Sequence, residues 1–200
     1  MSGSEPFDEA RALGVIQEMV QQSRYRLGRS AVYFMMWGGC IIAACLLHYS
    51  FIQLQDGRGV YVWPVFITLG VIGSLLIGWR QARTEQRHSR SYIDRINTYI
   101  WAGSSLPFAI LVGVGSVYGW AAAYPAFIAF FGWGALVTGG LLRFRPLIAG
   151  GIASWGIAGF TLFVNGPEIL LLLAAALLLS YVIPAFLMWR ADTAAAVQKS

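Results

Sequence analysis

Long apolar runs dominate this sequence and restrict the folds it can adopt. Six runs of roughly 20 residues cover residues 31–51, 60–79, 96–117, 121–142, 147–164 and 169–189. About 20 apolar residues are what a helix needs to cross the hydrocarbon core of a bilayer. Most runs have no polar face, which argues against a soluble helical core, and the alternating segments of a β-barrel are absent. We therefore predict an all-α polytopic membrane protein with six transmembrane helices, arranged as three hairpins.

A cluster of arginines between the second and third runs indicates how the chain is oriented. Arg80, Arg83, Arg87, Arg90 and Arg95 all lie within sixteen residues, RQARTEQRHSRSYIDR. So many arginines cannot cross a bilayer cheaply, so this loop is expected on the cytoplasmic side. It then orients both of its neighbours.

The remaining basic residues agree with this orientation. Thirteen of the fourteen Lys and Arg residues lie in the N-terminal segment, the arginine loop, the 143–145 turn or the tail, and Arg58 alone lies on the other side. Six crossings with both termini in the cytoplasm satisfy every loop. The net charge of +5 therefore reflects membrane orientation, and we expect no nucleic-acid partner.

The N-terminal segment has a different pattern from the apolar runs. Residues 7–28 read as an amphipathic helix, whose apolar side holds Ala12, Leu13, Ile16, Met19, Val20 and Leu27. Such a helix could lie on the lipid surface, or it could be a dimer contact or a dock for a cytosolic partner. No secretory signal peptide is expected. The predicted organisation is a cytoplasmic helix at 1–29, a membrane domain at 30–190 and a cytoplasmic tail at 191–200.

Local signals refine the helix boundaries. Ser91 to Asp94 has the form of a capping box, which predicts a helix start near Tyr92. Pro107 lies near the middle of the third run, where we expect a kink. Pro184 lies near the inner end of the sixth. Abundant glycine inside the runs indicates close helix packing, with self-association or a close-approach ligand site as alternatives.

The first two hairpins look like an internal repeat. The first has Trp37-Gly38-Gly39 in its first helix and opens its second with Trp63-Pro64-Val65-Phe66. The second hairpin has Trp101-Ala102-Gly103, then Tyr124-Pro125-Ala126-Phe127, at an offset near 63 residues. The third hairpin matches more weakly. Repeats with an even number of spans keep one orientation, so a duplication here is a parallel one. The alternative is that all helix pairs of this direction share interfacial aromatic residues.

Chemically reactive groups are scarce where a mechanism would need them. The middle of every predicted span lacks Asp, Glu, Lys and Arg, which proton-coupled carriers and many pumps require. Cys45 and His48 share a helix face, a weak hint of a metal site, while Cys40 points elsewhere. No catalytic, phosphate-binding or redox motif is present. We predict no enzyme activity, no cofactor and no metal site.

The chain resembles a group of six-span membrane proteins common in Bacteroidota whose activity is uncharacterised. The matching pieces are Ile16-Gln17-Glu18-Met19, Trp37-Gly38, Trp63-Pro64, Tyr92-Ile93-Asp94-Arg95, Tyr124-Pro125, Gly139-Gly140, Arg143-Phe144-Arg145-Pro146-Leu147-Ile148 and Gly150-Gly151. They are short and spread over most of the chain. The resemblance implies a bacterial inner-membrane location and carries no functional residue over.

Two hypotheses for function follow from these patterns. The first is a non-enzymatic sensor or regulatory subunit that engages a cytosolic partner or anionic lipid. The candidate contact residues are Arg80, Arg83, Arg87, Arg90, Ile16, Met19 and Val20. The second is a small transporter or homo-oligomeric channel for a neutral or apolar solute, suggested by the repeat and the Gly- and Pro-broken spans.

Overall fold

The computed structural model describes residues 9–84 and 92–197, where the chain is helical except for short connecting turns. In order it forms α1 (Glu9–Gln53), a 3₁₀ turn (Gly57–Tyr61), α2 (Val62–Thr84), α3 (Tyr92–Tyr118), α4 (Trp120–Leu142), α5 (Arg145–Thr161), α6 (Glu168–Leu177), a π-helical turn (Leu178–Val182) and α7 (Ile183–Val197). These described residues contain no strand. The predicted all-α class is confirmed. The described part of α3 opens at Tyr92, directly after the gap at 85–91, so the capping box at Ser91 to Asp94 stays a prediction.

Five helical segments are long and apolar enough to cross a membrane. They are Ser30–Gln53, Gly57–Gln81, Thr98–Tyr118, Trp120–Leu142 and Glu168–Ala191. This finding indicates a multi-pass membrane protein. The last segment joins α6, the π-helical turn and α7 into one continuous crossing.

The fifth apolar run forms a shorter helix than its sequence suggests. We predicted a span over 147–164, but α5 ends at Thr161. The amides of Leu162 and Phe163 bond to carbonyls only three residues back, so the helix tightens into turns and stops there. With 17 residues, α5 is about 26 Å long at 1.5 Å per residue.

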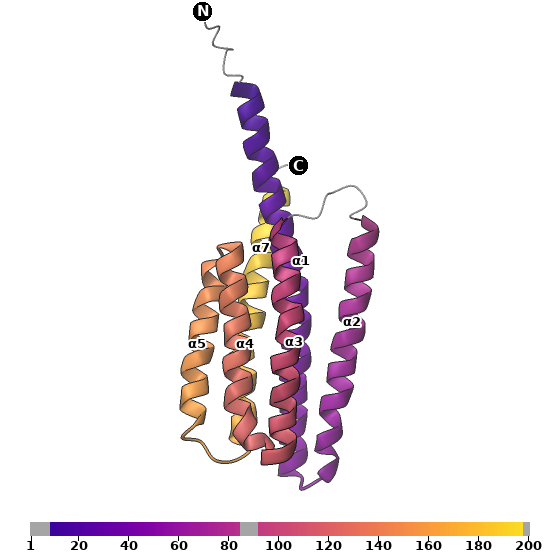
Figure 1. Ribbon diagram of the computed structural model, residues 1–200, viewed down its shortest axis with the longest axis vertical. Helices are drawn as coiled ribbons and strands as arrows, with labels where there is room; N and C mark the ends of the chain where they lie inside the picture. Colours follow the sequence, from indigo (N-terminus) through magenta and orange to yellow (C-terminus); the bar gives the residue numbers. More distant parts are fainter. Residues whose placement is uncertain (1–8, 85–91, 198–200) are drawn as a thin grey trace, which may run out of the picture.

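The helices run side by side in alternating directions (Figure 1). The C-terminus, the ends of α2 and α3 that flank residues 85–91, and the α4–α5 turn lie at one end of the bundle, and α1 extends beyond that end. The α1–α2, α3–α4 and α5–α6 connections lie at the opposite end. The end that holds the α4–α5 turn carries the arginines and is called the arginine end below.

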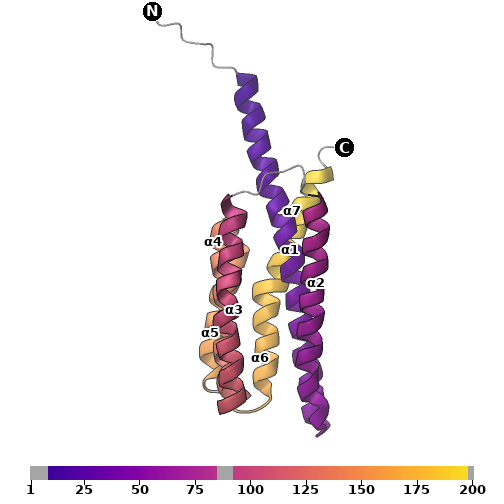
Figure 2. The same ribbon diagram turned by 45° about the vertical axis from the view of Figure 1, so that its right-hand side comes forward.

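Five helices make the core, and two lie outside it. α1, α4, α5, α6 and α7 pack against one another, whereas α2 packs on α1 and α3 packs on α4 (Figure 2). α2 and α3 bury only 11% of their most apolar windows. Their outward side chains are large and apolar, as with Leu75 and Leu106, which are 68% and 67% exposed. A surface of this kind suits contact with lipid chains and not with water.

Glycine allows α4 and α5 to come unusually close. A Cβ at Gly132 would lie 2.9 Å from the Gly151 carbonyl oxygen, and a Cβ at Gly151 would lie 2.7 Å from the Gly132 carbonyl oxygen. A Cβ at Gly139 would meet the Ile148 amide nitrogen at 2.9 Å. Small residues permit this backbone contact, which drives helix association in lipid. The predicted close packing is seen at these positions.

Pro184 accounts for the break in the last crossing. Proline has no amide hydrogen and its ring collides with the carbonyl four residues back, here that of Ser180. The chain widens into the π-helical turn over these residues, and the Ile183 amide bonds to the Leu178 carbonyl, five residues back. The turn is buried at Ser180 and Tyr181, so its irregular backbone is shielded from lipid. Pro107, by contrast, lies within α3 without ending it.

The N-terminal segment is not a separate helix. One unbroken helix of 45 residues, Glu9–Gln53, covers both the predicted amphipathic segment and the predicted first span. No cap or glycine turn separates them, so the helix continues along its own axis and projects past the arginine end (Figures 1 and 2). In this arrangement the segment does not turn to lie across the end of the bundle.

Candidate functional site

The arginine end gathers exposed cations beside aromatic rings. Arg80 and Arg83 are exposed at the end of α2, and the Arg83 guanidinium lies 3.7 Å from the centre of the Trp79 ring. Arg190 on α7 lies 5.1 Å from the centre of the Phe186 ring. Such cation–π contacts hold the charge at the edge of the apolar zone.

The other predicted contact residues are only partly located. Arg87 and Arg90 lie outside the described residues. Ile16, Met19 and Val20 lie on the projecting part of α1, of which the structure describes the backbone. Their role as a contact face stays a prediction.

A groove that the sequence did not reveal opens between α1 and α7 near the arginine end. It has a volume of about 560 Å³ and is lined by Val32, Met35, Met36, Phe186 and Trp189. Val32 lies two residues from the start of the first crossing, and Trp189 two residues from the end of the last. Both walls therefore lie at the same depth. The two walls are about 150 residues apart in sequence, so the sequence does not show that they meet. The adjacent Met35 and Met36 are a local signal for such a groove, because methionine is common at adaptable apolar surfaces.

A second cluster lies inside the bundle around the π-helical turn. The hydroxyls of Ser154 and Ser180 donate to the same carbonyl, that of Ala176, at 3.2 and 2.7 Å. The hydroxyls of Tyr181 and Thr138 are buried and have no hydrogen-bond partner within the described structure. A Cβ at Gly134, one helical turn from Thr138, would lie 3.3 Å from the Tyr181 hydroxyl.

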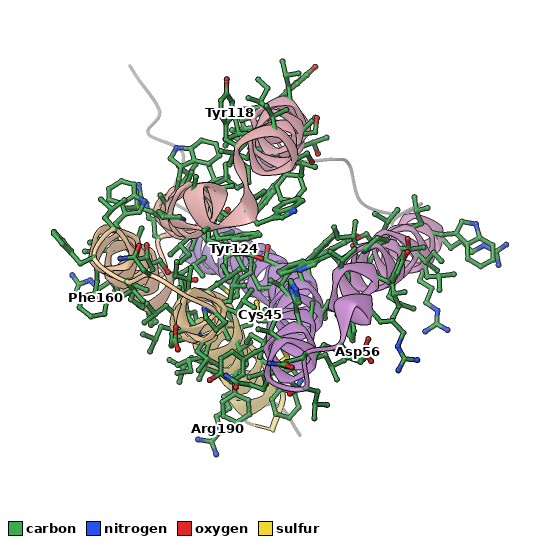
Figure 3. The ribbon with its side chains drawn as sticks, turned by 90° about the horizontal axis from the view of Figure 1, so that it is seen from below. Cys45, Asp56, Tyr118, Tyr124, Phe160 and Arg190 are labelled. Carbon is green, nitrogen blue, oxygen red and sulfur yellow. The ribbon has the colours of Figure 1, made fainter. Side chains whose placement is uncertain are left out.

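The opposite end of the bundle holds a histidine–tryptophan pair. The Trp63 indole donates to Nδ1 of His48 at 2.8 Å and so ties α2 to α1. Figure 3 looks along the bundle from this end and places Cys45 and Tyr124 inward, with Tyr118 and Phe160 pointing outward. Within the described part of the chain, no group of three His, Cys, Asp or Glu could hold a metal ion. Within these residues, the possible metal site at Cys45 and His48 therefore has no third ligand.

An ion pair caps the connection between α1 and α2. Asp56 accepts hydrogen bonds from the side chain and the amide of Arg58, with a shortest contact of 2.7 Å. These bonds lower the pKa of the Asp56 carboxyl, the side-chain bond most strongly. The arrangement starts the 3₁₀ turn and holds Arg58, the one exception to the distribution of basic residues, at the end opposite the other arginines of the described loops and helix ends.

Comparisons with known proteins give no relative from which to transfer a function. No family model, no curated protein and no solved structure matches this chain. The resemblance to the six-span Bacteroidota group therefore stays a prediction. What remains for assigning a role is the geometry itself: the projecting helix, the arginine end and the groove between α1 and α7.

Proposed function

We propose that this protein is a non-enzymatic sensor or regulatory subunit of the bacterial cytoplasmic membrane, in which α1 passes information to a cytosolic partner. The chain would cross the membrane six times, with α5 as the short fifth crossing and both termini inside. The positive-inside rule supports this orientation, because the basic residues of the described loops and helix ends, apart from Arg58, lie at the end of the bundle from which α1 projects.

One observation carries the proposal: the helix that packs on the largest number of other elements is also the one that leaves the bundle. α1 packs on α2, α4, α6, α7, the 3₁₀ turn and the π-helical turn. Residues 9–29 of α1 continue the same helix outside the bundle for about 31 Å, at 1.5 Å per residue. Because an unbroken helix transmits rotation and displacement along its axis, a shift in the bundle would reach the N-terminal end.

The alternative, a transporter for a neutral solute, has a different supporting feature. The π-helical turn lies within the last crossing, and the buried Tyr181 and Thr138 hydroxyls nearby lack partners. Broken helices with unpaired polar groups are typical of transport sites. The connectivity of α1 favours the first proposal, since a solute pathway does not require a helix that projects from the bundle.

Photo-crosslinking in cells tests the proposal. A photoreactive residue at Met19 is expected to give a discrete adduct with a cytosolic protein, whereas the same group at Leu75, an exposed position on α2, should give only lipid adducts. Deleting residues 1–28 should release that partner from membranes, and deleting residues 191–200 should not. If Met19 gives the same adducts as Leu75, or if the deletion changes neither partner recovery nor any phenotype, the proposal fails.

A further inference from the structure

The groove between α1 and α7 lies at a depth that only particular molecules can reach. Its deepest residue on α1, Met36, is six residues from the start of the crossing at Ser30, which is about 9 Å along the helix. The groove therefore spans the hydrocarbon nearest the arginine end. A soluble protein cannot reach this level, but a lipid chain lies there naturally.

The groove walls are apolar but adaptable. Val32, Phe186 and Trp189 are 44%, 40% and 51% exposed, although they belong to core-forming helices. Two methionines, Met35 and Met36, supply flexible side chains that fit irregular apolar shapes. The space over these side chains, about 560 Å³, is wide open to the surroundings, so it suits a chain lying along the surface and not an enclosed ligand.

Arg190 places a positive charge beside two of the residues that line this apolar groove. Arg190 follows the lining residue Trp189 directly, is exposed, and lies over the ring of Phe186, another lining residue. Among the side chains that the structure describes, both acids, Asp56 and Glu168, lie at the opposite end of the bundle.

We propose that the groove between α1 and α7 is a binding site for one anionic phospholipid, whose acyl chain packs on Val32, Met36 and Phe186 while its phosphate pairs with Arg190. The charge complementarity selects the headgroup, and the groove selects a single position among the lipids around the bundle. This site is independent of the cytosolic partner proposed above. Loss of either one would leave the other intact.

Native mass spectrometry of the full-length protein provides the test. The probes are phosphatidylglycerol and phosphatidylcholine with identical chains. We expect one tightly held phosphatidylglycerol, and about fivefold weaker binding of it in Arg190→Gln, as expected for one basic residue near an anionic headgroup. Arg190→Lys should retain most of the affinity. Arg143→Gln, which removes an exposed arginine at the same end but on the α4–α5 turn, is the matched control and should bind as the wild type does.

A second variant separates the groove from the charge. Val32→Trp should fill the groove and weaken both lipids, with the thermal midpoint recorded to show that the bundle is folded. Equal affinity for the two lipids in the wild type, or an equal loss in Arg143→Gln and Arg190→Gln, would show that charge acts diffusely and overturn the proposal. Unchanged binding in Val32→Trp, or a dimer that excludes lipid, would overturn it too.

Discussion

At the scale of single residues, the first two predicted hairpins each pack a tryptophan against a glycine, but they differ in the hydrogen bond formed beside it. In the first, the Trp37 indole lies against Gly70 and donates to the Ser74 hydroxyl at 3.0 Å. In the second, Trp101 lies against Gly134. These two residues and Thr138 each come 64 residues after their counterparts Trp37, Gly70 and Ser74. The Thr138 hydroxyl has no partner in the described structure. The hydrogen bond that joins the helices of the first hairpin is therefore not formed at the equivalent place in the second.

Thr138→Val tests whether that hydroxyl is truly unpaired. Removing a buried hydroxyl that lacks a partner should stabilise the protein by about 1 kcal/mol. The reason is that burying this hydroxyl without a hydrogen bond costs free energy, and valine does not carry that cost. The measurement is unfolding by SDS titration in mixed micelles. Destabilisation would instead show that a water molecule or a ligand occupies the space beside Tyr181.

Ser180→Ala is the matched control for this substitution. The Ser180 hydroxyl is equally buried but donates to the Ala176 carbonyl at 2.7 Å. Its removal should cost about 0.5–1 kcal/mol, a typical value for a hydrogen bond within a membrane protein. The two substitutions are thus expected to have opposite signs.

At the scale of helices, α5 is held on two sides by glycines that are neighbours in sequence. Gly151 faces α4, while Gly150 faces the π-helical turn. A Cβ at Gly150 would lie 2.5 Å from the Leu179 carbonyl oxygen and 2.7 Å from the Ser180 Cα. Both are backbone atoms, which cannot move aside as a flexible side chain would.

Gly150→Ala should therefore destabilise the bundle by about 1–3 kcal/mol, the usual cost of overpacking a tight core. Gly156→Ala, on the same helix, is the control because a Cβ there meets nothing within 4 Å. That change should be neutral or slightly stabilising, since alanine is the better helix former. Equal effects of the two substitutions in SDS titration would contradict the close contact between α5 and the π-helical turn.

At the scale of the whole molecule, the sequence predicts the crossings better than their packing. The apolar runs correctly indicated an all-helical chain with several helices of membrane-spanning length, although α1 is longer and α5 shorter than the sequence suggests. They could not show that α2 and α3 lie outside the core, because lipid-facing and buried positions are equally apolar. The groove between α1 and α7 depends on residues from opposite ends of the chain. Pro184 marked the disturbed region of the last crossing, but not its π-helical form.

The orientation of the entire bundle is open to a direct labelling experiment. In a background with Cys40 and Cys45 replaced by alanine, single cysteines at positions 58 and 87 would be treated in intact cells with a membrane-impermeant maleimide. Arg58 lies at the end opposite the other described arginines, and the sequence predicts that Arg87 shares their side. Arg58→Cys should therefore react from outside, and Arg87→Cys should react only after the cells are opened. Reaction of both in the same compartment would mean that the basic residues do not mark one face. The α1 projection would then no longer be placed in the cytoplasm, and the proposed partner and lipid leaflet would both have to be abandoned.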